Sequence, residues 1–158
     1  MNYDALDPIE IRLDRAAEAC ARDGARLTEI RRRVLALVLG SREPMGAYAL
    51  LDRLKSEKAN ATPATIYRAL DFLQAHALIH KVERLNAFIG CTEEGEHPHR
   101  HDVQFLICLR CGTVAELEDG GIAAAVATAA AASGFRPAHA IVEVEGLCAA
   151  CAAAPAQA

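Results

Sequence analysis

Two cysteine pairs in the C-terminal half carry the clearest chemistry in the sequence. Cys108 and Cys111 form one C-x2-C pair, and Cys148 and Cys151 form a second pair that begins 37 residues after Cys111. Two such pairs can supply four thiolates in a tetrahedron, which is how proteins usually hold a structural zinc ion. With six cysteines in a chain that we expect to be cytoplasmic, metal or redox chemistry is favoured over a disulfide framework.

A second group of potential metal ligands occupies the middle of the chain. If the segments around residues 85–86 pair as a hairpin that turns there, His80 lies opposite Cys91 at about 5 Å. A second hairpin, turning through the first cysteine pair, places His101 and Glu116 on one face. Together the four side chains carry two negative charges, which balance a divalent cation, and the soft thiolate favours zinc over iron(II). The alternative is that they are unrelated surface or core residues.

The remaining cysteine and histidines give weaker signals. Cys20 lies on the apolar face of an expected helix, which favours a buried core thiol over a ligand or redox group. His97 and His99 stand in an acidic segment, which favours a solvated linker over an auxiliary metal site. We expect structural roles for His76 and His139.

Hydrophobic periodicity and turn residues divide the chain into two parts. The first part is predicted to hold four helices and then a β-hairpin, at about residues 8–23, 29–39, 46–58, 63–73, 79–84 and 87–91. The second part is predicted to hold three strands and an alanine-rich helix, at about residues 103–108, 113–117, 122–132 and 138–145. The fold class is therefore α+β, with the outline of a winged helix-turn-helix followed by a small α/β unit.

The fourth helix is the candidate for reading DNA. In a winged helix-turn-helix this helix enters the major groove by its N-terminal end, where Thr65, Tyr67 and Arg68 are expected to be exposed. An arginine there can form a bidentate pair with guanine, and a tyrosine can meet a thymine methyl group or a phosphate. Residues 1–90 carry 14 Lys/Arg against 12 Asp/Glu, and residues 91–158 carry 3 against 9. The net positive first part can therefore bind a polyanion, and the net negative second part can bind cations.

Length and composition limit the classes of protein. In 158 residues, aromatic side chains make up only 4% and tryptophan is absent, so two modest cores are favoured over one large core. Small cores often need a metal or another cross-link for stability. No run of about 18 apolar residues is present to span a membrane. The acidic N-terminus argues against a signal peptide, so we expect a cytoplasmic protein.

Four segments, taken in order, resemble the ferric uptake regulator family, and most closely its zinc uptake regulators: ATPATIYRALDFL, HKVERLNAFIGC, FLICLRCGTVAEL and GLCAAC. The likeness runs from about Leu27 to Cys151. It implies a homodimeric bacterial repressor that binds double-stranded DNA. The expected parts are a winged-helix domain (1–92), a hinge (93–101), an α/β dimerisation domain with a structural zinc (102–152) and a disordered tail (153–158).

Carried over position by position, the resemblance assigns roles to these residues and implies two zinc ions per subunit. The structural zinc ligands fall on Cys108, Cys111, Cys148 and Cys151. The sensing ligands fall on His80, Cys91, His101 and Glu116. The base-contacting residues fall on Tyr48 and Arg68, with Tyr67 beside them. Iron and peroxide sensors of the family tend to carry His-x-His before the first cysteine pair, where this chain has Val103 and Phe105, which cannot ligate a metal.

We therefore expect a zinc-responsive transcriptional repressor, not an enzyme, in which zinc at the hinge closes the dimer onto a palindromic operator. A repressor of the same family that senses iron, manganese, nickel or peroxide is the first alternative. A thiol redox protein is disfavoured by two cysteine pairs together with an acidic ligand set. A zinc hydrolase is disfavoured because its metal keeps an open coordination position. Neither a membrane partner nor a small-molecule substrate is expected.

Overall fold

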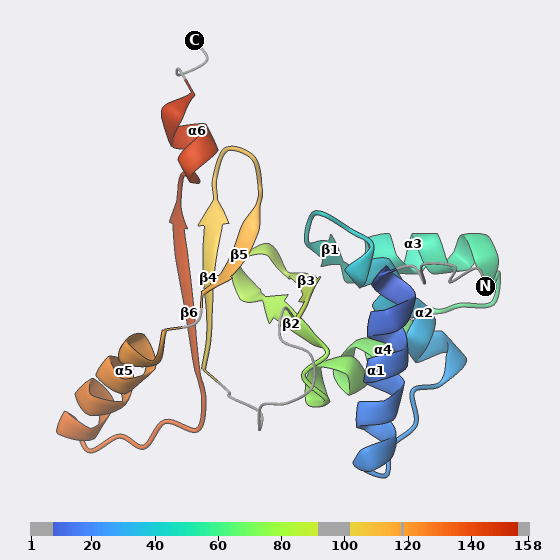
Figure 1. The fold of residues 1–158 in the computed structure, drawn as a ribbon, viewed down its shortest axis with the longest axis horizontal. Helices are drawn as coiled ribbons and strands as arrows, with labels where there is room; N and C mark the ends of the chain where they lie inside the picture. Colours follow the sequence, from blue (N-terminus) through green and yellow to red (C-terminus); the bar gives the residue numbers. More distant parts are fainter. Residues whose placement is uncertain (1–7, 92–101, 118, 155–158) are drawn as a thin grey trace, which may run out of the picture. The chain divides into compact units, whose positions relative to one another are not determined.

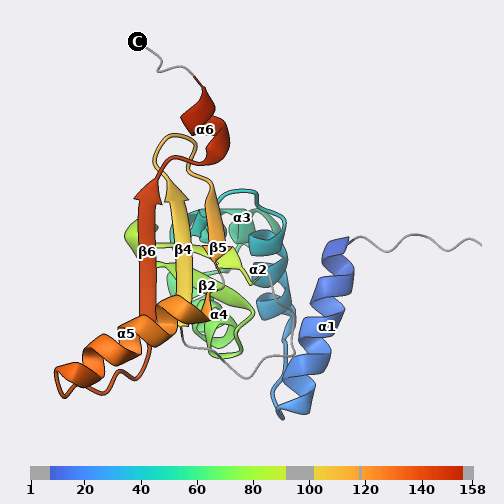
Figure 2. The ribbon, with the colours of Figure 1, turned by 60° about the vertical axis from the view of Figure 1, so that its left-hand side comes forward.

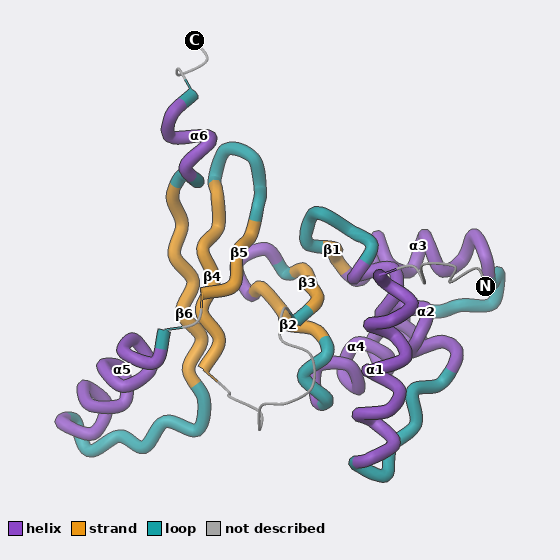
Figure 3. The backbone as a smooth tube through the Cα atoms, in the orientation of Figure 1, coloured by secondary structure: helices purple, strands orange, loops and turns teal. Residues whose placement is uncertain are grey.

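The computed structural model describes residues 8–91, 102–117 and 119–154 of the chain. The chain divides into two units, residues 1–97 and residues 98–158, which are described separately. Figures 1 and 3 show that the first unit holds most of the helices and a small sheet. The second unit holds a sheet of longer strands and two helices.

The first unit begins with four helices, α1 (Pro8–Arg22), α2 (Glu29–Leu39), α3 (Ala47–Glu57) and α4 (Pro63–Ala75), close to the predicted positions. Each contributes apolar side chains to one core, and Leu13, Val34, Leu54 and Leu70 are at most 1% exposed. Burying a side chain of this size stabilises a fold by about 1.5–3 kcal/mol. In the described part of the chain, no helix is both long and apolar enough to cross a membrane.

The start of α4 is fixed by its first residues. The Thr62 hydroxyl accepts a hydrogen bond from the backbone N–H of Thr65, and the Thr65 hydroxyl accepts one from the N–H of Thr62, both at 3.3 Å. This reciprocal capping box satisfies two N–H groups, and Pro63 at the first helical position needs no partner for its nitrogen. The N-terminal end of α4 is therefore a defined surface.

A three-stranded antiparallel sheet completes the first unit, with β3 (Ala87–Gly90) between β1 (Met45–Gly46) and β2 (Ile79–Val82). β1 was not predicted from the sequence, and β2 ends two residues earlier than predicted. The chain leaves β2 at Val82 in a short 3₁₀ turn (Glu83–Leu85), and Asn86 follows in the left-handed region at φ 46°.

This turn sets the register of the hairpin. His80 pairs with Ile89, and the N–H of Cys91 donates to the carbonyl of Leu78 at 3.1 Å. The predicted pairing of His80 opposite Cys91 is therefore wrong. Four residues, 83–86, form the turn instead of two, so its centre lies one residue earlier than expected.

The second unit contains a sheet in which β4 (Asp102–Cys108) lies between β5 (Val114–Leu117) and β6 (Ala140–Gly146). β5 runs antiparallel to β4, whereas β6 runs parallel to it after the crossover helix α5 (Gly120–Ala132). Asp119 caps α5 by accepting a hydrogen bond from the N–H of Gly121 at 2.7 Å. Figure 2 shows the three strands side by side, with α6 (Ala149–Ala153), which was not predicted, after the end of β6.

The second unit buries little apolar surface. Among its described residues, the buried apolar side chains are Phe105, Ile107 and Cys108. No residue of α5 is buried, and Ile141 and Val144 of β6 are 44% and 50% exposed. The sheet and helix of this unit therefore keep a broad apolar surface uncovered within the single chain.

Candidate metal centre and DNA-reading surface

Four cysteines of the second unit converge at one place. Cys108 ends β4, Cys111 lies in the turn that follows, and Cys148 and Cys151 lie before and within α6. Their Sγ atoms all lie within 4.8 Å of one another, and those of Cys111 and Cys148 are 3.8 Å apart. A zinc ion bound to four sulfurs at about 2.3 Å requires sulfur–sulfur separations of about 3.8 Å. The four side chains therefore fit a tetrahedral zinc ion.

The parallel pairing of β4 and β6 explains this convergence. Cys108 lies opposite Gly146, so each cysteine pair follows the same end of the sheet. Gly112 has φ +72°, a conformation that glycine adopts without strain, and its N–H donates to the Cys108 carbonyl at 2.9 Å. The first pair is thus closed by a tight turn, and the second by the start of α6.

Hydrogen bonds give the sulfurs unequal proton affinities. The backbone N–H groups of Cys111 and Cys148, the latter 3.3 Å from the Cys108 sulfur, help lower the pKa of Cys108 to about 6. The hydroxyl of Thr113, 3.1 Å from the Cys111 sulfur, lowers the pKa of Cys111. The neighbouring Cys148 thiol raises the pKa of Cys151 to about 12. Before a metal binds, Cys108 is therefore largely a thiolate at neutral pH, whereas Cys151 keeps its proton.

Arg110 lies inside the first cysteine pair and contacts the second. Its Nη1 donates to the backbone carbonyls of Cys151 and Ala154, the latter at 3.3 Å. α6 has only five residues, and so short a helix is not stable on its own in water. Arg110 therefore helps hold α6 beside the first pair. This role was not predicted from the sequence, where its only signal was a basic residue between two cysteines.

The second predicted ligand set is distributed over both units. In the first unit, Cys91 follows β3 two residues after Ile89, the partner of His80, so His80 and Cys91 are diagonal neighbours on one face. In the second unit, Glu116 lies on β5 opposite Phe105. His101 lies outside the described residues. The four-residue set remains a prediction.

The other cysteine and histidines lie as follows. Cys20 is buried in α1, as predicted, and burial raises the pKa of its thiol. His76 ends α4 with its ring 4.3 Å from that of Phe72 and its Nδ1 3.8 Å from Asp23 Oδ2. His139 is exposed before β6. His97 and His99 lie outside the described residues.

The predicted DNA-contacting residues lie on α3 and α4. Tyr48 in the first turn of α3 is 67% exposed, and Tyr67 in α4 is 46% exposed. Arg68, beside Tyr67, is also exposed. Thr65 is half-buried, and its hydroxyl belongs to the capping box. Two tyrosines and an arginine are therefore accessible on neighbouring helices, whereas Thr65 is partly occupied by the helix start.

The fold and the four-cysteine centre define an α+β protein with a site suited to zinc. The model of the ferric uptake regulator family matches residues 22–145, and the chain belongs to this family, as the sequence analysis predicted. The zinc uptake regulation protein of Escherichia coli (strain K12) is 40% identical over 139 residues, which are 88% of this chain and 80% of the relative. The zinc uptake regulation protein of Mycobacterium tuberculosis (strain H37Rv) is 28% identical over 132 residues, 81% of this chain and 95% of the relative.

Solved structures agree with this family. The structure of a zinc uptake regulator complexed with zinc and DNA is 38% identical, with a TM-score of 0.87 over 92% of this chain and 96% of the other. The crystal structure of holo XcZur is 43% identical, with a TM-score of 0.81 over 90% of this chain and 97% of the other.

Proposed function

We propose that the protein is a zinc-responsive, DNA-binding repressor that controls zinc uptake genes. The observation that carries the proposal is the likeness, over 92% of the chain, to a zinc uptake regulator complexed with zinc and DNA. The curated relative from E. coli, at 40% identity, is a zinc uptake regulation protein. Regulation by metal, not catalysis, is the activity that these similarities support.

The first unit is proposed to read DNA as a winged helix-turn-helix. α4 would enter the major groove by its capped N-terminal end, with the β2–β3 hairpin as the wing. The exposure of Arg68 and Tyr67 on α4 and of Tyr48 on α3 supports base or phosphate contacts by these residues. Thr65 would add a contact to the sugar-phosphate backbone of DNA near the same end of α4.

Each subunit is proposed to hold two zinc ions with different tasks. Cys108, Cys111, Cys148 and Cys151 would hold a structural ion, which supplies a cross-link with apparent binding free energy of about 10–16 kcal/mol. His80, Cys91, His101 and Glu116 would hold the sensed ion. The position of His80 and Cys91 on one face of the hairpin supports this second set. Its two negative charges match a divalent cation.

The active form is proposed to be a homodimer built on the second unit. α5, none of whose residues is fully buried, and the exposed Ile141 and Val144 of β6 supply an apolar surface that a second copy would cover. A two-fold dimer places two copies of α4 on successive half-sites of a palindrome. Zinc would favour the DNA-binding arrangement only as far as it binds that arrangement more tightly.

Metal titrations of DNA binding test the proposal. DNA fragments are first selected from a random pool by the zinc-loaded protein, and their affinity is then measured against Zn²⁺, Fe²⁺ and Mn²⁺. Cys91→Ser is compared with Cys20→Ala, which changes a buried thiol outside both ligand sets. We expect zinc to tighten binding in the wild type and in Cys20→Ala but not in Cys91→Ser. Tightening by iron or manganese alone would identify the alternative sensor of the same family.

A further inference from the structure

The N-terminal helix reaches Cys91, the residue directly after β3. The Nη2 of Arg12, in the middle of α1, donates to the backbone carbonyl of Cys91 at 2.7 Å in a partly buried position. The two residues are 79 positions apart in the sequence. α1 precedes α4, the helix proposed to enter the major groove. A charged donor on α1 therefore holds the peptide of a proposed zinc ligand.

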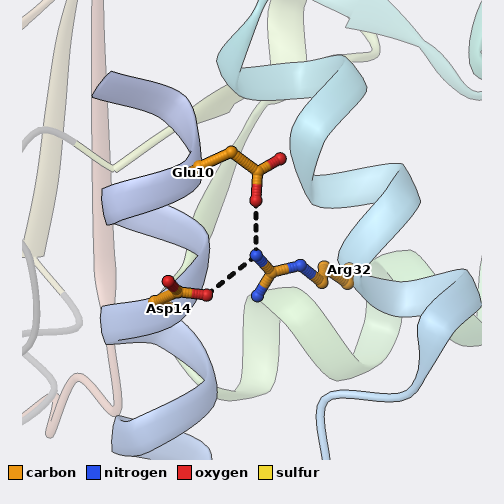
Figure 4. A network of polar contacts seen from close by, with 3 residues as sticks. All are labelled: Glu10, Asp14 and Arg32. Atoms are coloured by element: carbon orange, nitrogen blue, oxygen red, sulfur yellow. Dashed lines mark hydrogen bonds and ion pairs between the residues drawn. The ribbon is translucent and has the colours of Figure 1, made fainter. Parts of the chain in front are cut away.

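The same helix is fastened to α2 by a second arginine. Figure 4 shows Arg32 of α2 pointing between two carboxylates of α1. Its Nη2 lies 2.6 Å from Glu10 Oε2 and 2.8 Å from Asp14 Oδ1. Leu13 of α1, 1% exposed, packs into the core that α2 and α4 share. α1 is therefore anchored to the body of the first unit along both its polar and its apolar face.

Gly90, directly before Cys91, allows α2 to approach the same strand. A Cβ atom at this position would lie 2.5 Å from Cδ2 of Leu39, at the end of α2, and 3.7 Å from Nη2 of Arg12. The first distance is far below van der Waals contact, so any larger residue would displace Leu39. The backbone at Gly90 and Cys91 is thus in close contact with side chains of both α1 and α2.

We propose that Arg12 is a positioning residue of zinc sensing, which fixes the Cys91 backbone to the α1–α2 scaffold. The inference rests on the proposed role of Cys91 as a sensing ligand. With the peptide held in place, less conformational entropy is lost when the thiolate binds zinc. A shift of Cys91 when it binds zinc is also transmitted through α1 and α2 to α4. Because coupling between two sites is reciprocal, Arg12 should affect both zinc affinity and the response of DNA binding to zinc.

The test replaces Arg12 with Met, which keeps an apolar stem and removes the donors. Arg22→Met, at the exposed end of the same helix, makes the same charge change away from Cys91. Zinc affinity of the second site is measured by competition with a fluorescent chelator in protein that keeps its four-cysteine zinc. DNA affinity is measured with and without zinc at the second site, on the selected fragments.

In Arg12→Met we expect zinc affinity to fall about tenfold or more, the size of one hydrogen bond that involves a charged group. The zinc-dependent gain in DNA affinity should fall with it, and Arg12→Lys should recover part of both. Loss of a positive charge by itself would strengthen cation binding, so a weaker site identifies positioning as the cause.

The role of Arg12 would be overturned if Arg12→Met had the same zinc affinity and the same zinc-dependent gain in DNA affinity as Arg22→Met. It would also be overturned if Arg12→Met had a lower melting temperature but an unchanged zinc affinity. The ligand assignment is tested separately by Cys91→Ser. If that variant binds the second zinc normally, the proposed sensing set fails, whatever Arg12→Met does.

Discussion

Removing the four-cysteine zinc should unfold the second unit and leave the first one folded. The large buried apolar side chains described in the second unit are Phe105 and Ile107, which contribute about 1.5–3 kcal/mol each. A structural zinc contributes about 10–16 kcal/mol of apparent binding free energy, several times more than these two side chains. The first unit has its own core, which includes Leu35, Leu50 and Leu73.

Amide hydrogen exchange, followed by mass spectrometry of peptides, measures this difference. Zinc is removed with a strong chelator under reducing conditions, and in parallel by Cys111→Ser, which deletes one ligand. We expect peptides from β4, β6 and α6 to lose most of their protection, because Cys108 and Cys148 fasten the ends of these elements. Peptides from α2 and α4 should keep theirs. Size-exclusion chromatography should show the loss of dimers.

Restoring zinc provides the control for the chelator experiment. Protection in β6 and α6 should return with one equivalent of zinc per subunit in the wild type and not in Cys111→Ser. If these peptides stay protected after the zinc content has fallen to zero, packing within the second unit is sufficient. The structural role of the metal would then be refuted.

Three further predictions concern the four-cysteine centre and the DNA-reading surface. Replacing Arg110 with Met should speed zinc release to a chromogenic chelator several-fold relative to Arg136→Met, because α6 loses its clamp; equal rates would exclude the clamp. Arg68→Lys should reduce binding to selected DNA about tenfold or more and leave non-specific binding nearly unchanged, because a bidentate pair with guanine is lost; an equal loss on both DNAs would indicate a phosphate contact. Zinc affinity of the four-cysteine site should rise by at least about one log unit per pH unit between pH 6 and 8. The reason is that zinc displaces the proton of Cys151, whose pKa is raised to about 12. Cys108, whose pKa is lowered to about 6, adds to the slope mainly near pH 6. Calorimetry in buffers of different ionisation enthalpy counts the released protons, and none at neutral pH would contradict this proton assignment.

Much of the architecture is determined by local sequence patterns. The spacing of apolar residues predicted the four helices of the first unit, because a helix that buries one face needs apolar residues at every third or fourth position. Thr62 and Pro63 predicted the start of α4, because the cap and the proline act on the residues next to them. The two cysteine pairs predicted a four-sulfur centre, because the short C-x2-C spacing brings two thiolates of each pair close together.

Only the tertiary structure decided the contacts between distant segments. The register that pairs His80 with Ile89 depends on where the turn is centred. Moving that centre by one residue would change the partner of every residue in the hairpin. The contact of Arg12 with Cys91 spans 79 residues, and that of Arg110 with Cys151 spans 41. Neither follows any sequence period, because a long side chain meets a distant carbonyl only after helices and strands have packed. The sequence by itself thus determined the elements and the two cysteine pairs, and folding decided which arginines contact the backbone at Cys91 and Cys151.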